Sequence, residues 1–205
     1  MSTGASSLAS PPTLVGLLWP SREDARLSAL RAAILMLVGT ALLTISAKIQ
    51  VPFYPVPMTM QTLVVLVLGA TYGWRLGGAT VILYLAEGAM GLPVFANTPP
   101  VTPGLAYLAG PTGGFLIGFV AAAVVTGLMA ERGWDRPLWR VLVMMIIGHS
   151  VIFAFGLGWL SMLMPVAKAW QVGAAPFAAA TLLKTALAAA FMQAAWSIAA
   201  RRRDR

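Results

Sequence analysis

Positive charge in this chain is confined to a few places between long apolar segments. Of its fourteen Lys and Arg residues, eleven lie near the ends of the sequence or in two short connections. Hydrophobic residues make up 59% of the 205 residues and charged residues only 10%. That leaves too little polar surface to cover a water-soluble globule of this size. We therefore expect a single integral membrane domain over residues 1–205.

Six segments have the length and composition of membrane-crossing helices, which need about 20 mostly apolar residues, or fewer beside a protein-lined pocket. The expected fold is an all-α membrane protein with six transmembrane helices. The core covers about residues 27–200, after a cytoplasmic segment (1–26) and before a basic cytoplasmic tail (201–205). The six segments are residues 27–47, 58–73, 76–92, 112–130, 138–163 and 177–200.

The orientation follows from the excess of Lys and Arg that membrane proteins carry in their cytoplasmic connections. Only Lys48 and Lys168 fall in outer connections, and Lys184 lies within the sixth segment. We expect both termini in the cytoplasm and a multi-pass protein of the cell membrane. This orientation puts eleven arginines on or next to the cytoplasmic face: Arg22, Arg26, Arg31, Arg75, Arg132, Arg136, Arg140, Arg201, Arg202, Arg203 and Arg205.

The three outer connections, residues 48–57, 93–111 and 164–176, are long, nearly uncharged and rich in proline. Irregular apolar backbone near a membrane must be buried in protein or line a cavity, because lipid cannot satisfy its peptide groups. The sequence therefore predicts a ligand pocket near the outer face, built from these loops.

Lys184 is the strongest candidate for a functional residue. It lies about 10 Å below the outer start of the sixth segment, and Thr181 lies one turn earlier on the same face. An ionisable side chain left in lipid costs roughly 2.5 to 3.5 kcal/mol. Lys184 could instead extend its side chain to the headgroups or pair with Glu87, which is more readily interpreted as a hydrated helix-end residue.

Further candidates for substrate binding lie at a similar depth: Gln61, Tyr84, Asn97, Thr112 and Gly113. Gln61 and Asn97 each offer a donor and an acceptor, which suits a neutral, amide-like ligand better than a metal ion. Either could instead satisfy loop backbone. The Gly-rich sequence of residues 110–114, at a helix start, could present peptide N–H groups to an anion or serve close packing.

Other classes of function lack their sequence signals. His149 falls in the middle of the fifth segment without a second ligand at metal-binding spacing, which favours a packing role over a proton relay. The chain has no cysteine, no phosphate-binding loop, no zinc-protease motif and no nucleophile turn. Its basic residues do not form one stripe interleaved with aromatics. We expect no enzyme activity, no cofactor or metal, and no nucleic acid partner.

Three motifs stand in this order along the chain: Pro55-Val-Pro-Met-Thr-Met-Gln-Thr-Leu63, Tyr84-Leu-Ala-Glu-Gly-Ala-Met-Gly-Leu-Pro-Val-Phe-Ala96 and Gly110-Pro-Thr-Gly-Gly-Phe-Leu-Ile-Gly-Phe119. Together they resemble the BioY family. These proteins are the biotin-capturing S components of energy-coupling factor (ECF) transporters. The resemblance implies that this chain transports biotin, held near the outer face, and docks with a transmembrane coupling subunit and two ATP-binding-cassette ATPases that hydrolyse ATP.

The resemblance also assigns roles to single residues. Gln61 and Asn97 match polar positions of the family's outer pocket. Lys184 matches the lysine of a motif that usually reads Pro-Phe-x-Pro-Gly-Asp-x-x-Lys. Here that motif reads Pro176-Phe-Ala-Ala-Ala-Thr-Leu-Leu-Lys184, so Thr181 replaces the aspartate thought to accept hydrogen bonds from the ureido ring. Either Lys184 or the amides of residues 112–114 would bind the carboxylate.

Small residues spaced by four on the first helix often meet the coupling subunit in S components of this type. The resemblance therefore points to Thr40 and Thr44, with Gly39 nearby, as partner contacts. Two alternatives stay open: a self-sufficient secondary transporter of a small vitamin-like solute, or a membrane-embedded enzyme using Lys184 or His149. The first would ordinarily show an inverted repeat or a buried carboxylate relay, and the second would need a nucleophile or metal partner.

Overall fold

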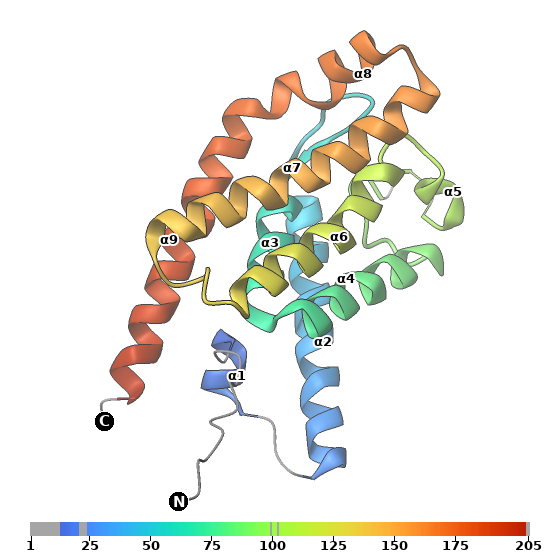
Figure 1. Ribbon diagram of the computed structural model, residues 1–205. Coiled ribbons are helices and arrows are strands. Elements are labelled where there is room, and N and C mark those ends of the chain that lie inside the picture. The colour runs from blue at the N-terminus through green and yellow to red at the C-terminus, as the bar shows by residue number, and fades with distance from the viewer. Residues whose placement is uncertain (1–12, 21–23, 99, 102, 204–205) are drawn as a thin grey trace, which may run out of the picture.

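The chain folds into a bundle of helices with one short β-hairpin (Figure 1). The computed structural model describes residues 13–20, 24–98, 100–101 and 103–203. The predicted helical class is confirmed apart from the hairpin. The elements are α1 (Leu14–Leu18), α2 (Ala25–Lys48), β1 (Gln50–Val51), β2 (Met58–Thr59), α3 (Gln61–Tyr72), α4 (Trp74–Ala89), α5 (Leu105–Leu108), α6 (Gly113–Ala130), α7 (Leu138–Leu163), α8 (Val166–Gly173), the 3₁₀ turn η1 (Ala175–Phe177) and α9 (Ala178–Arg203).

Four stretches of the described chain are helical, long and apolar enough to cross a membrane: α2, α6, α7 and the stretch from Val166 to Arg201 that contains α9. The second and third predicted segments are also helical, but α3 has 12 residues and α4 has 16. At 1.5 Å per residue they span about 18 Å and about 24 Å, less than the roughly 30 Å of hydrocarbon. Length and composition therefore identify four membrane spans, where the sequence predicts six.

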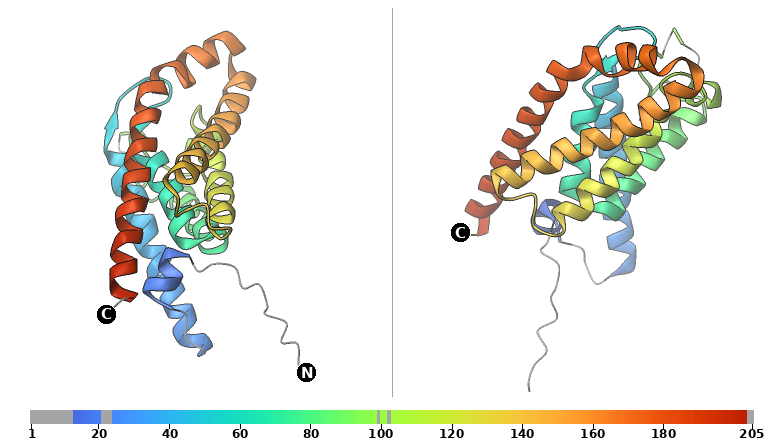
Figure 2. Two further views of the ribbon diagram at one scale, coloured as in Figure 1. Left: turned by 60° about the vertical axis from the view of Figure 1, so that its left-hand side comes forward. Right: turned by 45° about the horizontal axis from the view of Figure 1, so that its top comes forward.

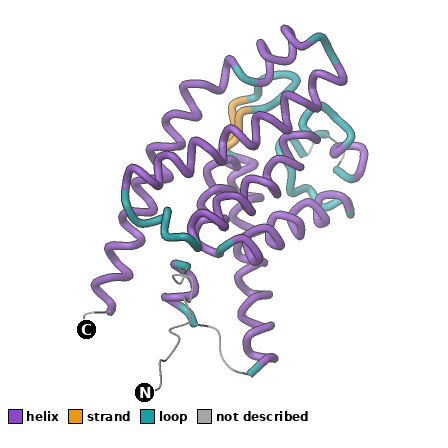
Figure 3. Tube along the Cα trace, viewed as in Figure 1, coloured by secondary structure: helices purple, strands orange, loops and turns teal. Residues whose placement is uncertain are grey.

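Helix α3 is shorter than predicted because residues at its expected start form a strand instead. Thr59 pairs with Gln50, and Met58 pairs with Val51, in an antiparallel hairpin. Figure 3 shows the two strands in orange, next to the loops that connect them. Three short helices, α1, α5 and α8, lie in segments that the sequence predicts to be non-helical. They have 4 to 8 residues, and helices this short give no apolar periodicity from which to predict them.

Helix α6 lies at the centre of the bundle and packs against α7, α3 and α4. Small residues make the close approaches possible. A Cβ added at Gly69 of α3 would lie 2.5 Å from the carbonyl oxygen of Ala123, and one at Gly127 would lie 2.3 Å from the backbone nitrogen of Trp74. The buried core includes Leu66, Tyr84, Phe95, Met144 and Ile152.

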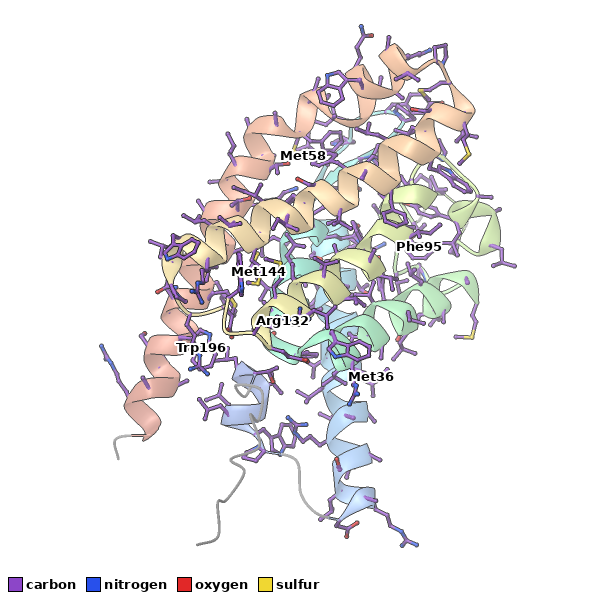
Figure 4. All side chains as sticks on the ribbon, in the orientation of Figure 1. Met36, Met58, Phe95, Arg132, Met144 and Trp196 are labelled. Carbon is purple, nitrogen blue, oxygen red and sulfur yellow. The ribbon has the colours of Figure 1, made fainter. Side chains whose placement is uncertain are left out.

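The bundle has two chemically different ends. At the arginine end lie the start of α2, the α3–α4 turn, the α6–α7 connection and the end of α9 (Figures 1 and 2). The described arginines of these segments are Arg26, Arg31, Arg75, Arg132, Arg136, Arg140 and Arg201; Arg22 and Arg205 lie outside the described residues. The loop end, which carries the hairpin, α5 and α8, has Lys48 and Lys168. Figure 4 places Arg132 and Trp196 nearer the first end, and Phe95 and Met58 nearer the second.

Candidate ligand-binding site

A cavity opens at the loop end, between the hairpin connection and helices α3, α6, α7 and α9. The non-atom space of this hollow is about 590 Å³, with the open solvent at its mouth included. Most of its wall is aromatic or aliphatic: Val56, Phe115, Leu116, Phe119, Ile152, Phe153 and Phe177. Seven further lining residues carry polar side-chain atoms: Thr59, Gln61, Thr62, Tyr107, Thr112, Thr181 and Lys184. Such a site can enclose an apolar body and hold a few polar atoms.

Lys184 projects from α9 into this cavity and is only 5% exposed. Its Nζ donates a hydrogen bond to the carbonyl oxygen of Thr59, at 2.7 Å. An ammonium has three N–H donors, and within the described part of the chain no other acceptor bonds to this one. The side chain therefore neither extends to the headgroups nor pairs with Glu87, and two of its donors remain for a ligand. Thr181, as predicted, faces the same cavity.

Gln61 is the first residue of α3 and is 3% exposed. Its Nε2 donates to the hydroxyl of Tyr84 at 2.7 Å, and its Oε1 accepts from Oγ1 of Thr59 at 3.2 Å. These two bonds fix which face of the amide turns toward the cavity, because the donor side is held by Tyr84 and the acceptor side by Thr59.

Tyr84 lies behind Gln61 and does not line the cavity. It is fully buried, and its hydroxyl donates to the carbonyl oxygen of Val94 at 2.9 Å while it accepts from Gln61. In this structure the Tyr84 side chain does not reach the cavity, and its contact with a substrate stays a prediction. Its role here is to orient Gln61, because a buried hydroxyl is fully used by one donor and one acceptor.

Thr62 is a cavity residue that sequence reasoning missed. The residue lines the cavity, and its Oγ1 is buried without a hydrogen-bond partner among the described residues. A helical threonine usually bonds a carbonyl of the preceding turn, so nothing in the sequence marks Thr62 as available. A buried hydroxyl without a partner is costly, and a ligand polar atom would satisfy it.

Asn97 lies at the approach to the cavity instead of in its wall. It lines an outer hollow of about 970 Å³, open space included, which shares Pro57, Tyr107 and Thr112 with the cavity. Its backbone has φ of 58°, a left-handed conformation that asparagine adopts more readily than most residues. Its Oδ1 accepts from Nε2 of Gln50 at 2.8 Å, which leaves the amide nitrogen as its free donor side.

The start of α6 contributes Thr112 to both hollows, but the glycines after it serve packing. A Cβ at Gly113 would lie 1.9 Å from the carbonyl oxygen of Leu108, and one at Gly114 would lie 2.2 Å from Cβ of Trp159. Gly113, a predicted binding residue, lines neither hollow. The packing interpretation of this Gly-rich sequence therefore accounts for both residues.

His149 lies in the core of the bundle, outside the cavity wall. Its Nδ1 is 2.9 Å from the carbonyl oxygen of Met145 and 3.3 Å from Oγ1 of Thr185. It is 3% exposed. These contacts fit the packing role that the sequence favours.

The predicted partner contacts on α2 are not on a free surface. Gly39 and Thr40 are buried inside the bundle, and a Cβ at Gly39 would lie 2.4 Å from Cγ2 of Thr80 on α4. Thr44 is half-buried and donates to the carbonyl oxygen of Thr40 at 2.9 Å. Gly39 and Thr40 therefore serve packing within the chain, and the contact with a coupling subunit stays a prediction.

A mostly apolar cavity with one buried lysine, among helices long and apolar enough to cross a bilayer, is typical of membrane proteins that bind a small molecule. Comparison with known proteins narrows this class. The model of the BioY family matches residues 21–201, and the chain belongs to the BioY family.

Individual relatives agree with the family match. The biotin transporter BioY of Thermotoga maritima is 39% identical over 153 residues, which cover 74% of this chain and 88% of that protein. The biotin transporter BioY of Rhizobium etli is 35% identical over 178 residues, or 82% of this chain and 90% of that one. The crystal structure of the S component for biotin from an ECF-type ABC transporter shares the fold, with a TM-score of 0.69 at 20% identity, covering 90% of this chain and 96% of that one.

Proposed function

We propose that this chain is the S component of an ECF-type transporter, which captures biotin at the outer face of the cell membrane and delivers it inward. The observation that carries the proposal is the cavity at the loop end, with Lys184 and Gln61 in its wall, in a chain whose relatives are named biotin transporters.

The chemistry of biotin suits this cavity. Its fused rings are compact and largely apolar, which matches the aromatic wall formed by Phe115, Phe153 and Phe177. Its ureido group needs both donors and acceptors, which the hydroxyls of Thr62 and Thr181 provide. Its carboxylate, or the ureido oxygen, accepts from the two free N–H groups of Lys184. A site that leaves buried polar groups unpaired without its ligand discriminates against compounds lacking the matching groups.

The proposed topology is one membrane domain of six crossings, with both termini cytoplasmic and the cavity outside. Arginines gather at one end of the bundle, as expected for a cytoplasmic face. Helices α3 and α4 are short for a full crossing, but the hairpin and the loop after α4 continue them at the loop end. Irregular backbone is acceptable at that depth because it is buried in protein or lines a cavity.

The proposed partners are a transmembrane coupling subunit and two ATP-binding-cassette ATPases, which supply the energy. Because Gly39 and Thr40 are buried, we place the small-residue contact nearer the start of α2, at Ala29 and Ala33. Both are exposed and are spaced by four residues, which lets another helix approach closely. In this proposal Ala33→Trp abolishes ATP-dependent uptake and leaves biotin binding to the isolated chain unchanged.

Equilibrium binding of labelled biotin to the purified chain tests the binding claim. We expect saturable binding at micromolar ligand, a strong loss in Lys184→Ala, and a smaller loss in Asn97→Ala because Asn97 lies outside the cavity wall. Lys168→Ala, which changes an exposed lysine at the same end of the bundle, serves as the matched control. Absence of binding in the unmodified chain overturns the proposal.

Uptake assays test the coupling claim separately. Cells that express this chain alone should accumulate no biotin against a gradient, and co-expression of the coupling subunit and ATPases should produce ATP-dependent uptake. Concentrative uptake by the chain alone would contradict the coupling claim and leave the binding claim intact.

A further inference from the structure

The turn formed by residues 94–98, here called the Asn97 turn, is held by side chains from separate elements. Tyr84 of α4 donates to the carbonyl oxygen of Val94, and Tyr107 of α5 donates to that of Ala96, both at 2.9 Å. Two carbonyls of this short turn are thus bonded to side chains of different helices. The conformation of the turn depends on those helices more than on its own backbone.

Lys48 makes three hydrogen bonds to the turn. Its Nζ donates to the carbonyl oxygen of Phe95 at 2.7 Å, to Oγ1 of Thr98 at 3.2 Å, and also to the carbonyl oxygen of Thr98. The hydroxyl of Thr98 in turn donates to Phe95 at 2.6 Å. One ammonium therefore uses its donors on both ends of the turn.

This arrangement differs from the ordinary role of a lysine in the last turn of a helix. Lys48 is the final residue of α2, where a cation usually interacts with its own helix's free carbonyls and dipole. Here it bonds residues 47 and 50 positions further along the chain. Gln50, two residues later, adds the bond to the Asn97 side chain. The last residue of α2 and the first residue of β1 are therefore both bonded to the turn through their side chains.

The Asn97 turn also forms part of the ligand site. Ala96 lines the cavity and Asn97 lines the outer hollow. Phe95, directly before these two residues, is fully buried, and its ring stacks on that of Tyr107 at 4.8 Å between centroids. Movement of this turn changes the wall of the cavity and its approach together.

We propose that Lys48 is a positioning residue that holds the Asn97 turn in place over the cavity and links this turn to the outer end of α2. Helix α2 runs from the arginine end to the loop end (Figure 1). A displacement of the last helical turn of α2 pulls the Lys48 ammonium away from Phe95 and Thr98 and loosens the Asn97 turn. The ligand part of this statement rests on the proposed function; the link between Lys48 and the turn does not.

Hydrogen–deuterium exchange of the purified chain without ligand tests the link directly. In Lys48→Met, the peptide N–H of Val94, which donates to the carbonyl oxygen of Leu92 at 2.8 Å, should exchange about tenfold faster than in the unmodified chain, because its turn loses hydrogen bonds from a charged donor, which are among the stronger ones. Amides of α6 and α7 should be unchanged. Lys168→Met is the matched control and should match the unmodified chain throughout, and Lys48→Arg should recover part of the protection.

Unchanged exchange of the Val94 peptide N–H in Lys48→Met overturns the proposal, and so does faster exchange spread evenly over the whole chain in both Lys48→Met and Lys48→Arg. The dissociation rate of labelled biotin provides the functional readout, with an expected increase of about three- to thirtyfold in Lys48→Met. If the unmodified chain binds no biotin, the proposed function fails, and the exchange measurement still decides the role of Lys48.

Discussion

Replacing Lys184 with methionine removes the cavity's cation while keeping most of the volume of its side chain. The structure shows one hydrogen bond from Nζ to Thr59 and two further N–H groups without a described acceptor. A hydrogen bond from a charged donor is worth about 1.5 to 3 kcal/mol, and about 1.4 kcal/mol corresponds to a tenfold change in affinity. Lys184→Met should therefore bind biotin about 10- to 100-fold more weakly.

A second ligand shows which end of biotin Lys184 holds. Biotinamide keeps the ureido ring and replaces the carboxylate with a neutral carboxamide. If Lys184 binds the carboxylate, the unmodified chain prefers biotin and Lys184→Met loses that preference. If it binds the ureido oxygen, both ligands weaken equally in the variant and their ratio is unchanged.

Isothermal titration of both ligands against the unmodified chain, Lys184→Met and Lys168→Met completes the design. Lys168 lies exposed on α8, so its replacement controls for a general loss of positive charge. Affinities of Lys184→Met within twofold of the unmodified chain for both ligands would refute the assignment of Lys184 to the site.

Three further predictions follow from single contacts. Thr181→Asp should raise biotin affinity, because it adds a charged hydrogen-bond acceptor to the cavity, and Thr181→Val should lower it. The reverse order of affinities in binding titrations would contradict the placement of the Thr181 hydroxyl at the ligand. Gly88→Ala should lower the unfolding temperature, because the new Cβ would lie 2.0 Å from Cζ of Phe95. Overpacking of this kind costs about 1–3 kcal/mol of stability. The control Gly158→Ala, whose new Cβ would have no atom within 4 Å, should be neutral or stabilising. Burial raises the pKa of Asp135, in the α6–α7 connection, to about 6, so the folded state binds this proton more tightly than the unfolded state and stability falls as pH rises from about 4 to about 6. Asp135→Asn should flatten thermal stability across that range, and an unchanged pH profile would exclude Asp135 as its source.

Much of the fold can be predicted from the sequence, because four apolar segments are long enough to identify helices by composition alone. The predicted segment 138–163 coincides with α7, and the predicted start of α6 differs by one residue. The short elements are different. Pairing of Thr59 with Gln50 depends on a turn between them, and no local pattern distinguishes those residues from the start of a helix.

The site is predictable where a polar side chain interrupts apolar sequence and hidden where the wall is apolar. Lys184 and Gln61 stand out because burying them needs a compensating partner. Phe115 and Phe153 look like ordinary core residues, although they line the cavity. The contacts of Lys48 join positions about fifty residues apart, so they depend on how the loop packs, which one sequence does not reveal.

Tyr84 shows that the depth of a residue in a membrane segment does not predict which way its side chain points. Its position in the third segment correctly indicates nearness to Gln61, and the two side chains bond at 2.7 Å. Which of them faces the cavity depends on the rotation of α4 about its axis. That rotation is set by packing, with Tyr84 directed at Val94 and Phe95.

The most direct test of the account is a crystal structure of the purified chain with biotin bound. We predict ligand density inside the cavity at the loop end, with a biotin oxygen within hydrogen-bond distance of Nζ of Lys184 and the fused rings against Phe115 and Phe153. Density confined to the outer hollow, or elsewhere on the molecule with the cavity empty, would contradict the claim that this cavity holds the transported ligand.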